Sequence, residues 1–149
     1  MQNCYEFFIA GRTRNKENIL RICEIFDQCN VTYYCFLKNE RSHLEAGLDL
    51  GMNPEDLMKK FEEMALESDS VRTIFEHDMQ AEKMSENFLL VLPAGKSAHI
   101  EAGVAYGLGK KCYAVGEYDV TDSLYLIFDK IFKDENELRD FLSIKGDSR

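Results

Sequence analysis

The fold is decided by one stretch of sequence, Phe88-Leu89-Leu90-Val91-Leu92-Pro93-Ala94-Gly95-Lys96-Ser97-Ala98-His99-Ile100-Glu101-Ala102-Gly103. Its first five residues are all apolar, which is typical of a β-strand that is buried on both faces. Pro93 and Gly95 interrupt this pattern, and Ser97 is a suitable N-cap for a following helix. A strand, a loop of small residues and a helix N-terminus in this order predict a ligand-binding position in an α/β sheet.

Glu101 is the candidate functional residue of this stretch. It falls in the first turns of the predicted helix, on a face with Ala98, Ala105 and Leu108. A capping box would place an acid three residues after Ser97, but Ile100 stands there. Glu101 is therefore either a reactive carboxylate or an acid favoured by the helix dipole. His99 also has two interpretations: it faces a ligand, or it is a first-turn polar residue with a local partner.

Size and charge limit the classes of function. The chain has 149 residues, of which 45% are hydrophobic, so we expect a single domain over residues 1–149. A net charge of −9 argues against nucleic acid or an anionic membrane as a partner. It leaves room for a small anionic ligand, because one helix N-terminus can bind an anion locally.

The cysteines and the hydropathy pattern point to the cytoplasm. Five cysteines are an odd number and show neither a CxxC motif nor the spacing of a metal site. Four of them fall in or beside predicted buried segments, so we expect reduced core thiols and no bound metal. No apolar run approaches the length of about 18 residues that suggests a membrane span.

The N-terminal part predicts a strand, a turn and a helix. Residues 5–10 are mostly apolar and lead into Gly11, and apolar residues then recur at helical spacing between positions 19 and 26. The turn is not a GxGxxG motif, so no dinucleotide fingerprint is present. Arg12 and Arg14 form a basic pair at the predicted C-terminal end of the strand. They are either ligand-binding groups or solvated loop charges.

The next predicted strand covers residues 31–37, which are β-branched and aromatic. A long segment follows up to Gly51, and connections of this length are often binding loops or lids. It contains His43-Leu44-Glu45-Ala46-Gly47, which is similar to residues 99–103. We interpret this copy as a coincidence, because it follows a charged run and not a buried strand.

Two helices are predicted ahead of the central strand, over residues 54–68 and 71–84. Asn53 and Pro54 are typical of a helix start. On the second helix, Asp78 shares an apolar stripe with Ile74 and with Val71, Phe75 and Met79. A carboxylate in such a stripe is paired, solvated by a cleft, or functional.

The C-terminal part completes an α/β pattern. Gly107 and Gly109 are typical of a helix end, residues 111–115 predict a further strand, and residues 130–132 predict an edge strand. Tyr118 lies in a polar loop, where it covers a ligand or only shields the surface. Asp134 and Glu137 predict the start of a last helix. The alternation predicts a parallel sheet of about five strands with helices on both faces.

These residues resemble the nucleoside 2-deoxyribosyltransferase family and its relatives, the deoxynucleoside 5′-monophosphate N-glycosidases. The resemblance covers most of the chain: a strand that ends at Gly11, a helix with Asp78 ahead of the central strand, and a late Asp129-Lys130-Ile131-Phe132 segment. Its most specific part is Glu101-Ala102-Gly103-Val104-Ala105-Tyr106-Gly107-Leu108-Gly109-Lys110.

The resemblance implies a flavodoxin-like, Rossmann-like three-layer α/β sandwich, usually dimeric or larger, that cleaves the bond between a base and a deoxyribose without a cofactor. It implies that Glu101 is the nucleophile and that Asp78 is the acid that contacts the base or assists its departure. It also implies that Gly95, Ser97 and His99 lie at the sugar 5′ end or a 5′-phosphate, with Gly11 and Arg12 contributing from the first turn.

Three functions remain open at this point. The first is an enzyme that cleaves the N-glycosidic bond of a nucleoside or nucleotide, by transfer to a base or to water. The second is a non-catalytic nucleotide-binding module on the same fold. The third is a flavin carrier, which is disfavoured because no phosphate loop rich in Ser and Thr follows the first strand.

Overall fold

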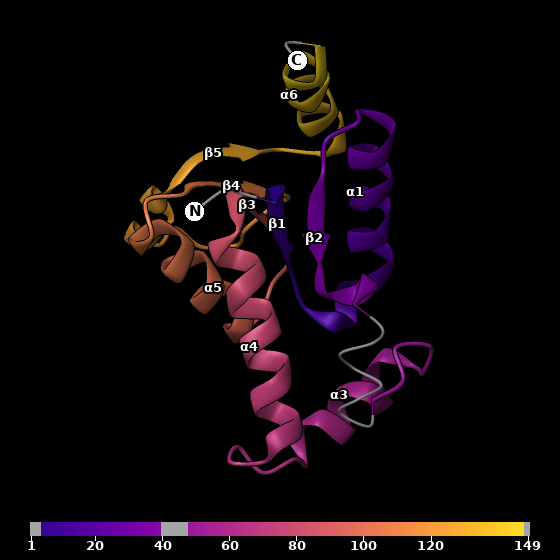
Figure 1. The fold of residues 1–149 in the computed structure, drawn as a ribbon. Coiled ribbons are helices and arrows are strands. Elements are labelled where there is room, and N and C mark those ends of the chain that lie inside the picture. Colours follow the sequence, from indigo (N-terminus) through magenta and orange to yellow (C-terminus); the bar gives the residue numbers. More distant parts are fainter. Residues whose placement is uncertain (1–3, 40–47, 148–149) are drawn as a thin grey trace.

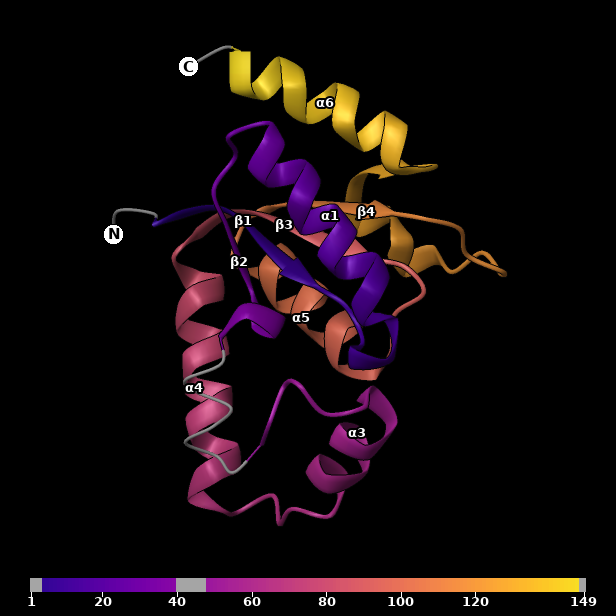
Figure 2. The same ribbon diagram turned by 90° about the vertical axis from the view of Figure 1, so that its right-hand side faces the viewer.

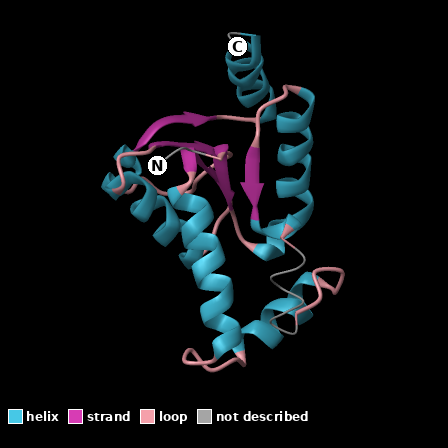
Figure 3. Cartoon of the chain, viewed as in Figure 1, coloured by secondary structure: helices cyan, strands magenta, loops and turns pink. Residues whose placement is uncertain are grey.

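The computed structural model describes residues 4–39 and 48–147, and there the chain forms a five-stranded sheet between helices (Figure 1 and Figure 3). All neighbouring strands are parallel, in the order β2-β1-β3-β4-β5. Their bounds are Tyr5–Ala10 for β1, Tyr33–Cys35 for β2, Ser85–Val91 for β3, Lys111–Val115 for β4 and Phe128–Phe132 for β5. The predicted α/β sandwich with a parallel sheet is confirmed.

The helices form two layers (Figure 2). Helices α1 (Lys16–Gln28) and α6 (Glu135–Asp147) pack on one face of the sheet, and α4 (Asp69–Lys83) and α5 (Lys96–Gly107) pack on the other. The short α3 (Pro54–Glu62) lies beyond the sheet, against the turn that follows β1. None of the described helices is long and apolar enough to cross a membrane.

Strand β3 is the centre of the core, as its apolar run predicts. Leu89 and Val91 pack on the α1 side, whereas Phe88 and Leu90 pack on the α5 side, and all four are fully buried. Because both faces of this strand are covered by helices, no position needs a polar side chain, and this explains why the apolar residues follow one another without alternation.

Helix α5 contacts the sheet through alanines. Ala98, Ala102 and Ala105 are buried against the strands, in the cluster that also contains Phe88 and Leu90. Because alanine ends at Cβ and protein interiors are close-packed, these residues let the helix backbone lie close to the sheet. Leu108, which was expected on the same face, instead follows the end of the helix and is 46% exposed.

The ends of the helices follow local hydrogen bonding. The Asn53 side chain accepts from the Glu55 N–H at 2.9 Å, as predicted for the start of α3. At α6, the Asp134 side chain accepts from the Glu137 N–H, and the Glu137 carboxylate accepts from the Lys133 N–H. Helix α5 ends at Gly107, and Gly109, just beyond the C-cap Leu108, adopts a positive φ of 79°.

Two predicted elements are shorter than expected. The strand expected over residues 31–37 covers only Tyr33–Cys35, because a 3-10 turn starts at Phe36. The helix expected over residues 54–68 ends at Glu62, since Ser68 instead caps α4 through its contact with the Val71 N–H. Residues 43–47 and most of the long segment around them lie outside the described residues.

A third apolar cluster fixes α3 beside α4. It contains Leu48, Leu50, Leu57 and Ile74. Two polar contacts join this unit to the turn after β1: Arg14 Nε lies 2.7 Å from a Glu55 carboxylate oxygen, and Lys16 donates to the Leu50 carbonyl at 2.7 Å. The turn after β1 is therefore fixed in part by contacts with α3 and the segment before it, which lie beyond the sheet.

All five cysteines are free thiols. Cys23, Cys35 and Cys112 are buried, Cys29 is half-buried, and Cys4 is exposed.

Candidate active site

Two loops meet at the C-terminal ends of β1 and β3. This is the point where the strand order reverses, and ligands of open α/β sheets bind in the crevice at such a point. A Cβ atom on Gly11 would lie 2.6 Å from Ile19 Cδ1 and 3.5 Å from the Val91 carbonyl oxygen. A Cβ on Gly95 would lie 4.0 Å from Arg12 Cβ. The structure thus brings together three of the predicted binding residues, Gly11, Arg12 and Gly95.

Side-chain amides join the same two loops. Asn15 and Asn18 both point their amide nitrogens at the Leu92 carbonyl oxygen, at 3.4 and 3.5 Å. Arg14 is turned away towards α3, where Glu55 and Glu62 raise its pKa by a hydrogen bond and by their charges. Arg12 is exposed and makes no ion pair with the described residues.

Helix α5 begins two residues earlier than expected. It starts at Lys96, and its N-cap is Gly95, without a capping side chain from the described residues. The prediction that Ser97 is the N-cap was wrong, because Ser97 is already the second residue of the helix. Ser97 is exposed there, one residue ahead of the buried Ala98. Its hydroxyl is thus placed on the solvent side of the helix start.

His99 joins the start of α5 to the 3-10 turn Ser123–Ile127. Its Nδ1 lies 2.7 Å from the Gly95 carbonyl oxygen, and its Nε2 lies 2.9 Å from the Tyr125 hydroxyl. A carbonyl oxygen only accepts, so Nδ1 carries a proton, and in the neutral ring Nε2 accepts from Tyr125. The two rings also stack, with centroids 5.8 Å apart. Both ring nitrogens are engaged within the chain.

Three carboxyl groups gather between α4 and α5. Glu101 is half-buried, and its pKa is raised well above the ordinary value by burial first, then by the charges of Asp78 and Glu82. Glu82 is only 1% exposed, and among the described residues neither of its carboxylate oxygens has a hydrogen-bond partner. Burial, followed by the charge of Asp78, raises the pKa of Glu82 to about 8. The cluster therefore retains protons at neutral pH.

Asp78 is hydrogen-bonded to a tyrosine from the sheet. The Tyr34 hydroxyl donates to Asp78 Oδ1 at 2.9 Å, and Asn39 Nδ2 donates to the Tyr34 hydroxyl oxygen at 2.9 Å. Burial, and secondarily the negative charge of Asp78, raises the pKa of Tyr34 well above its ordinary value, so its hydroxyl stays protonated.

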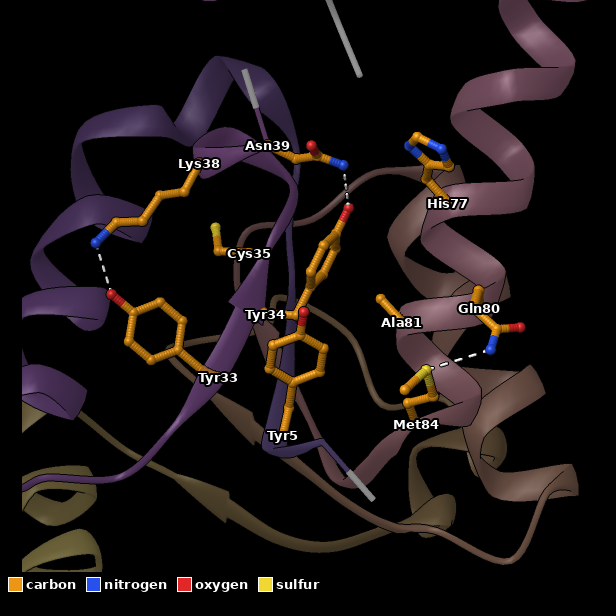
Figure 4. Close-up of a pocket in the computed structure, with 10 residues that line it drawn as sticks. All are labelled: Tyr5, Tyr33, Tyr34, Cys35, Lys38, Asn39, His77, Gln80, Ala81 and Met84. Carbon is orange, nitrogen blue, oxygen red and sulfur yellow. Dashed lines mark hydrogen bonds between the residues drawn. The ribbon is translucent and has the colours of Figure 1, made fainter. Parts of the chain in front are cut away.

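A pocket of about 450 Å³ lies beside this hydrogen bond, between the edge strand β2 and α4 (Figure 4). Aromatic and polar side chains line it: Tyr5, Tyr33, Tyr34, Cys35, Lys38, Asn39, His77, Gln80, Ala81 and Met84. Glu101 and the start of α5 are not among these residues. Within residues 4–39 and 48–147, no group of His, Cys, Asp or Glu side chains is arranged to hold a metal ion.

Sequence reasoning missed Glu82, Tyr34 and Asn39. Glu82 stands four residues after Asp78, so helical spacing alone places it on the same face. For Tyr34, strand alternation separates it from Tyr33 but does not tell which of the two faces α4. The Asn39 contact depends on the 3-10 turn after β2, which the sequence did not predict.

The strand order is that of the flavodoxin-like class of doubly wound sheets. Neither the protein-family models nor the curated proteins contain a match to this chain. Among solved structures, a similar one is a 2-deoxyribosyltransferase from the psychrotolerant bacterium Bacillus psychrosaccharolyticus. It superposes with a TM-score of 0.62 over 90% of each chain, at 15% sequence identity. The chain thus has the fold of a 2-deoxyribosyltransferase.

Proposed function

We propose that the protein cleaves the N-glycosidic bond of a deoxynucleoside or its 5′-monophosphate, with Glu101 as nucleophile and Asp78 as the acid for the base. The observation that carries this proposal is the placement of Glu101. It is a half-buried carboxyl group next to Asp78 and Glu82, on the helix that starts at the crevice between β1 and β3. The fold shared with a 2-deoxyribosyltransferase supports the same bond type.

The chemistry balances with these groups alone. The ionised Glu101 oxygen attacks the anomeric carbon, a C–O bond forms, and the C–N bond to the base breaks through an oxocarbenium-like transition state. The departing base takes up the proton held by Asp78. A second base or a water molecule then attacks the sugar and releases Glu101 as a carboxylate, while its proton returns to Asp78. Three close carboxyl groups do not all ionise together, so the cluster can keep the proton that the base needs.

The loop before α5 is the proposed site for the sugar 5′ end or a 5′-phosphate. Arg12 supplies an exposed positive charge beside Gly95, and the helix start supplies backbone N–H groups and a positive dipole end. Gly11 and Ser97 border the same loop, and His99 fixes its geometry through the Gly95 carbonyl. The proposed partner is accordingly a small nucleoside or nucleotide. The five free thiols fit the reducing cytoplasm.

A substrate panel tests the proposed function. We expect chromatography to show base release from deoxynucleosides or their 5′-monophosphates, with or without a free acceptor base. Release that needs an acceptor identifies a transferase, whereas release from monophosphates into water identifies a hydrolase. Absence of turnover across the panel, with nucleotide binding retained in Glu101→Ala, contradicts the proposal and favours the binding module.

The Arg12→Gln variant tests the proposed phosphate site. Its KM for monophosphates should rise roughly tenfold, because a charge-assisted phosphate contact contributes about 1.5 kcal/mol.

We further propose that the chain forms a homo-oligomer through the surface around the His99–Tyr125 contact. Ile100, Leu124 and Leu126 flank these two residues and are 61%, 72% and 88% exposed. Large exposed apolar side chains that gather on one surface are typical of interfaces. Sedimentation should therefore give at least twice the chain mass of 17.2 kDa, and the double substitution Leu124→Ser, Leu126→Ser should reduce it to one chain. A monomeric unmodified protein contradicts this proposal.

A further inference from the structure

The hydrogen bond between Tyr34 and Asp78 joins the sheet to the proposed acid. Asn39 Nδ2 donates to the Tyr34 hydroxyl oxygen, and the Tyr34 hydroxyl donates its own proton to Asp78 Oδ1, 2.9 Å away. The order of donors is Asn39, then Tyr34, then Asp78.

The Tyr34 ring is held by a row of aromatic rings across the sheet. In the strand register Tyr34 is paired with Phe8, and Phe8 is paired with Phe88 on the other side. The rings stack in the same order, with centroids 5.4 Å apart for Tyr34 and Phe8 and 5.8 Å apart for Phe8 and Phe88. Tyr5 closes the other side with an edge contact at 5.7 Å. The central strands therefore determine where the Tyr34 hydroxyl lies.

A hydrogen bond from such a fixed donor affects Asp78 in two ways. It restricts the carboxyl group to one orientation, and a productive geometry of this kind must be held to within about 0.5 Å. It also occupies Oδ1 as an acceptor, so the proton for the base is carried by the other carboxyl oxygen of Asp78.

We propose that Tyr34 is a positioning residue for Asp78: it holds the carboxyl group in the orientation that delivers the proton to the departing base. This inference rests on the proposed function of Asp78. It assigns to edge strand β2 a role in the reaction, although none of its residues is expected to touch the sugar. The Asn39 amide completes the arrangement by directing the Tyr34 proton.

The test compares two neighbouring tyrosines. Tyr34→Phe removes the hydroxyl and keeps the ring stack. Tyr33→Phe is the matched control, because the Tyr33 hydroxyl is also hydrogen-bonded, to Lys38 at 2.6 Å, but lies on the side of β2 away from helix α4 (Figure 4). We expect Tyr34→Phe to lower kcat by roughly 10- to 100-fold with KM nearly unchanged, and Tyr33→Phe to leave both near their original values.

Two additional measurements separate positioning from a merely structural effect. The loss in Tyr34→Phe should be smaller for a substrate whose base leaves easily without a proton. It should also nearly vanish when Asp78→Asn is already present, because residues acting through one group are not additive. Turnover by the unmodified protein and equally by Tyr34→Phe overturns this inference alone. No turnover by the unmodified protein on any substrate overturns the proposed function, and with it the role of Tyr34.

Discussion

Glu101→Gln should lower kcat for base release by roughly 10⁴-fold or more, the scale seen when a nucleophile is removed from an enzyme. The amide has nearly the shape of the carboxyl group but cannot attack the anomeric carbon. Glu86→Gln is the matched control, because Glu86 is an exposed residue of β3 at the opposite end of the strand from the crevice. Product formation followed by chromatography measures both variants. An undiminished rate in Glu101→Gln would show that Glu101 is not the nucleophile.

The pH dependence of the reaction gives a second view of the same residue. In the proposed reaction only the ionised Glu101 attacks, and burial with the charges of Asp78 and Glu82 raises its pKa. The rate at low substrate concentration should therefore increase with pH over a range well above the ordinary carboxyl value. Glu82→Gln removes one of the negative neighbours, so this increase should move to lower pH. A shift to higher pH would contradict the assigned electrostatics.

Glu82→Gln should also change how stability depends on pH. The pKa of Glu82 is raised from 4.5 to about 8 in the folded protein, so folding favours the protonated form. The stability linked to this group is complete below pH 4.5 and is lost as the pH rises through about 8. At about 1.4 kcal/mol per pKa unit, the free energy of unfolding should fall by roughly 3 kcal/mol or more between pH 5 and pH 9.

Urea unfolding at pH 5, 7 and 9 measures this effect. The glutamine variant should lack most of the decrease, and it should exceed the unmodified protein in stability at pH 9. The charged groups that act on Glu82 are Asp78 on its own helix and Lys110 beyond the end of α5. Glu86→Gln, an exposed carboxyl with the same chemical change, should keep the original pH dependence. The same slope in Glu82→Gln would show that Glu82 is not the group responsible.

The architecture was predictable because its signals are local and repeated. The apolar run of β3, the spacing along α1 and the caps at Asn53 and Asp134 each indicate one element, and their alternation indicates a parallel sheet. Boundaries were less predictable where one residue suits two roles. Ser68 was assigned to the end of one helix but caps the next, and Ser97 was assigned as a cap although Gly95 takes that position.

The site was predictable only in part, since it depends on contacts between distant segments. A carboxyl group in an apolar stripe identified Asp78 as a candidate, but its partner Tyr34 is 44 residues away. Glu82 was missed for a different reason: a glutamate near the end of a helix usually lies in solvent, whereas this one is buried in the folded chain. The roles of the predicted site residues remain predictions that the experiments above address.

The alanines beneath α5 suggest how such a site can be retuned. Helix α5 carries Glu101, and its buried side chains toward the strands are those of Ala98, Ala102 and Ala105. A larger side chain at any of these positions would move the helix away from the sheet. The Glu101 carboxyl group would move with it, which would change its position relative to a bound ligand. If Glu101 is the nucleophile, its reactivity is thus sensitive to the volume of apolar side chains on the buried side of α5, and exchanges among these can change it while every polar residue stays in place.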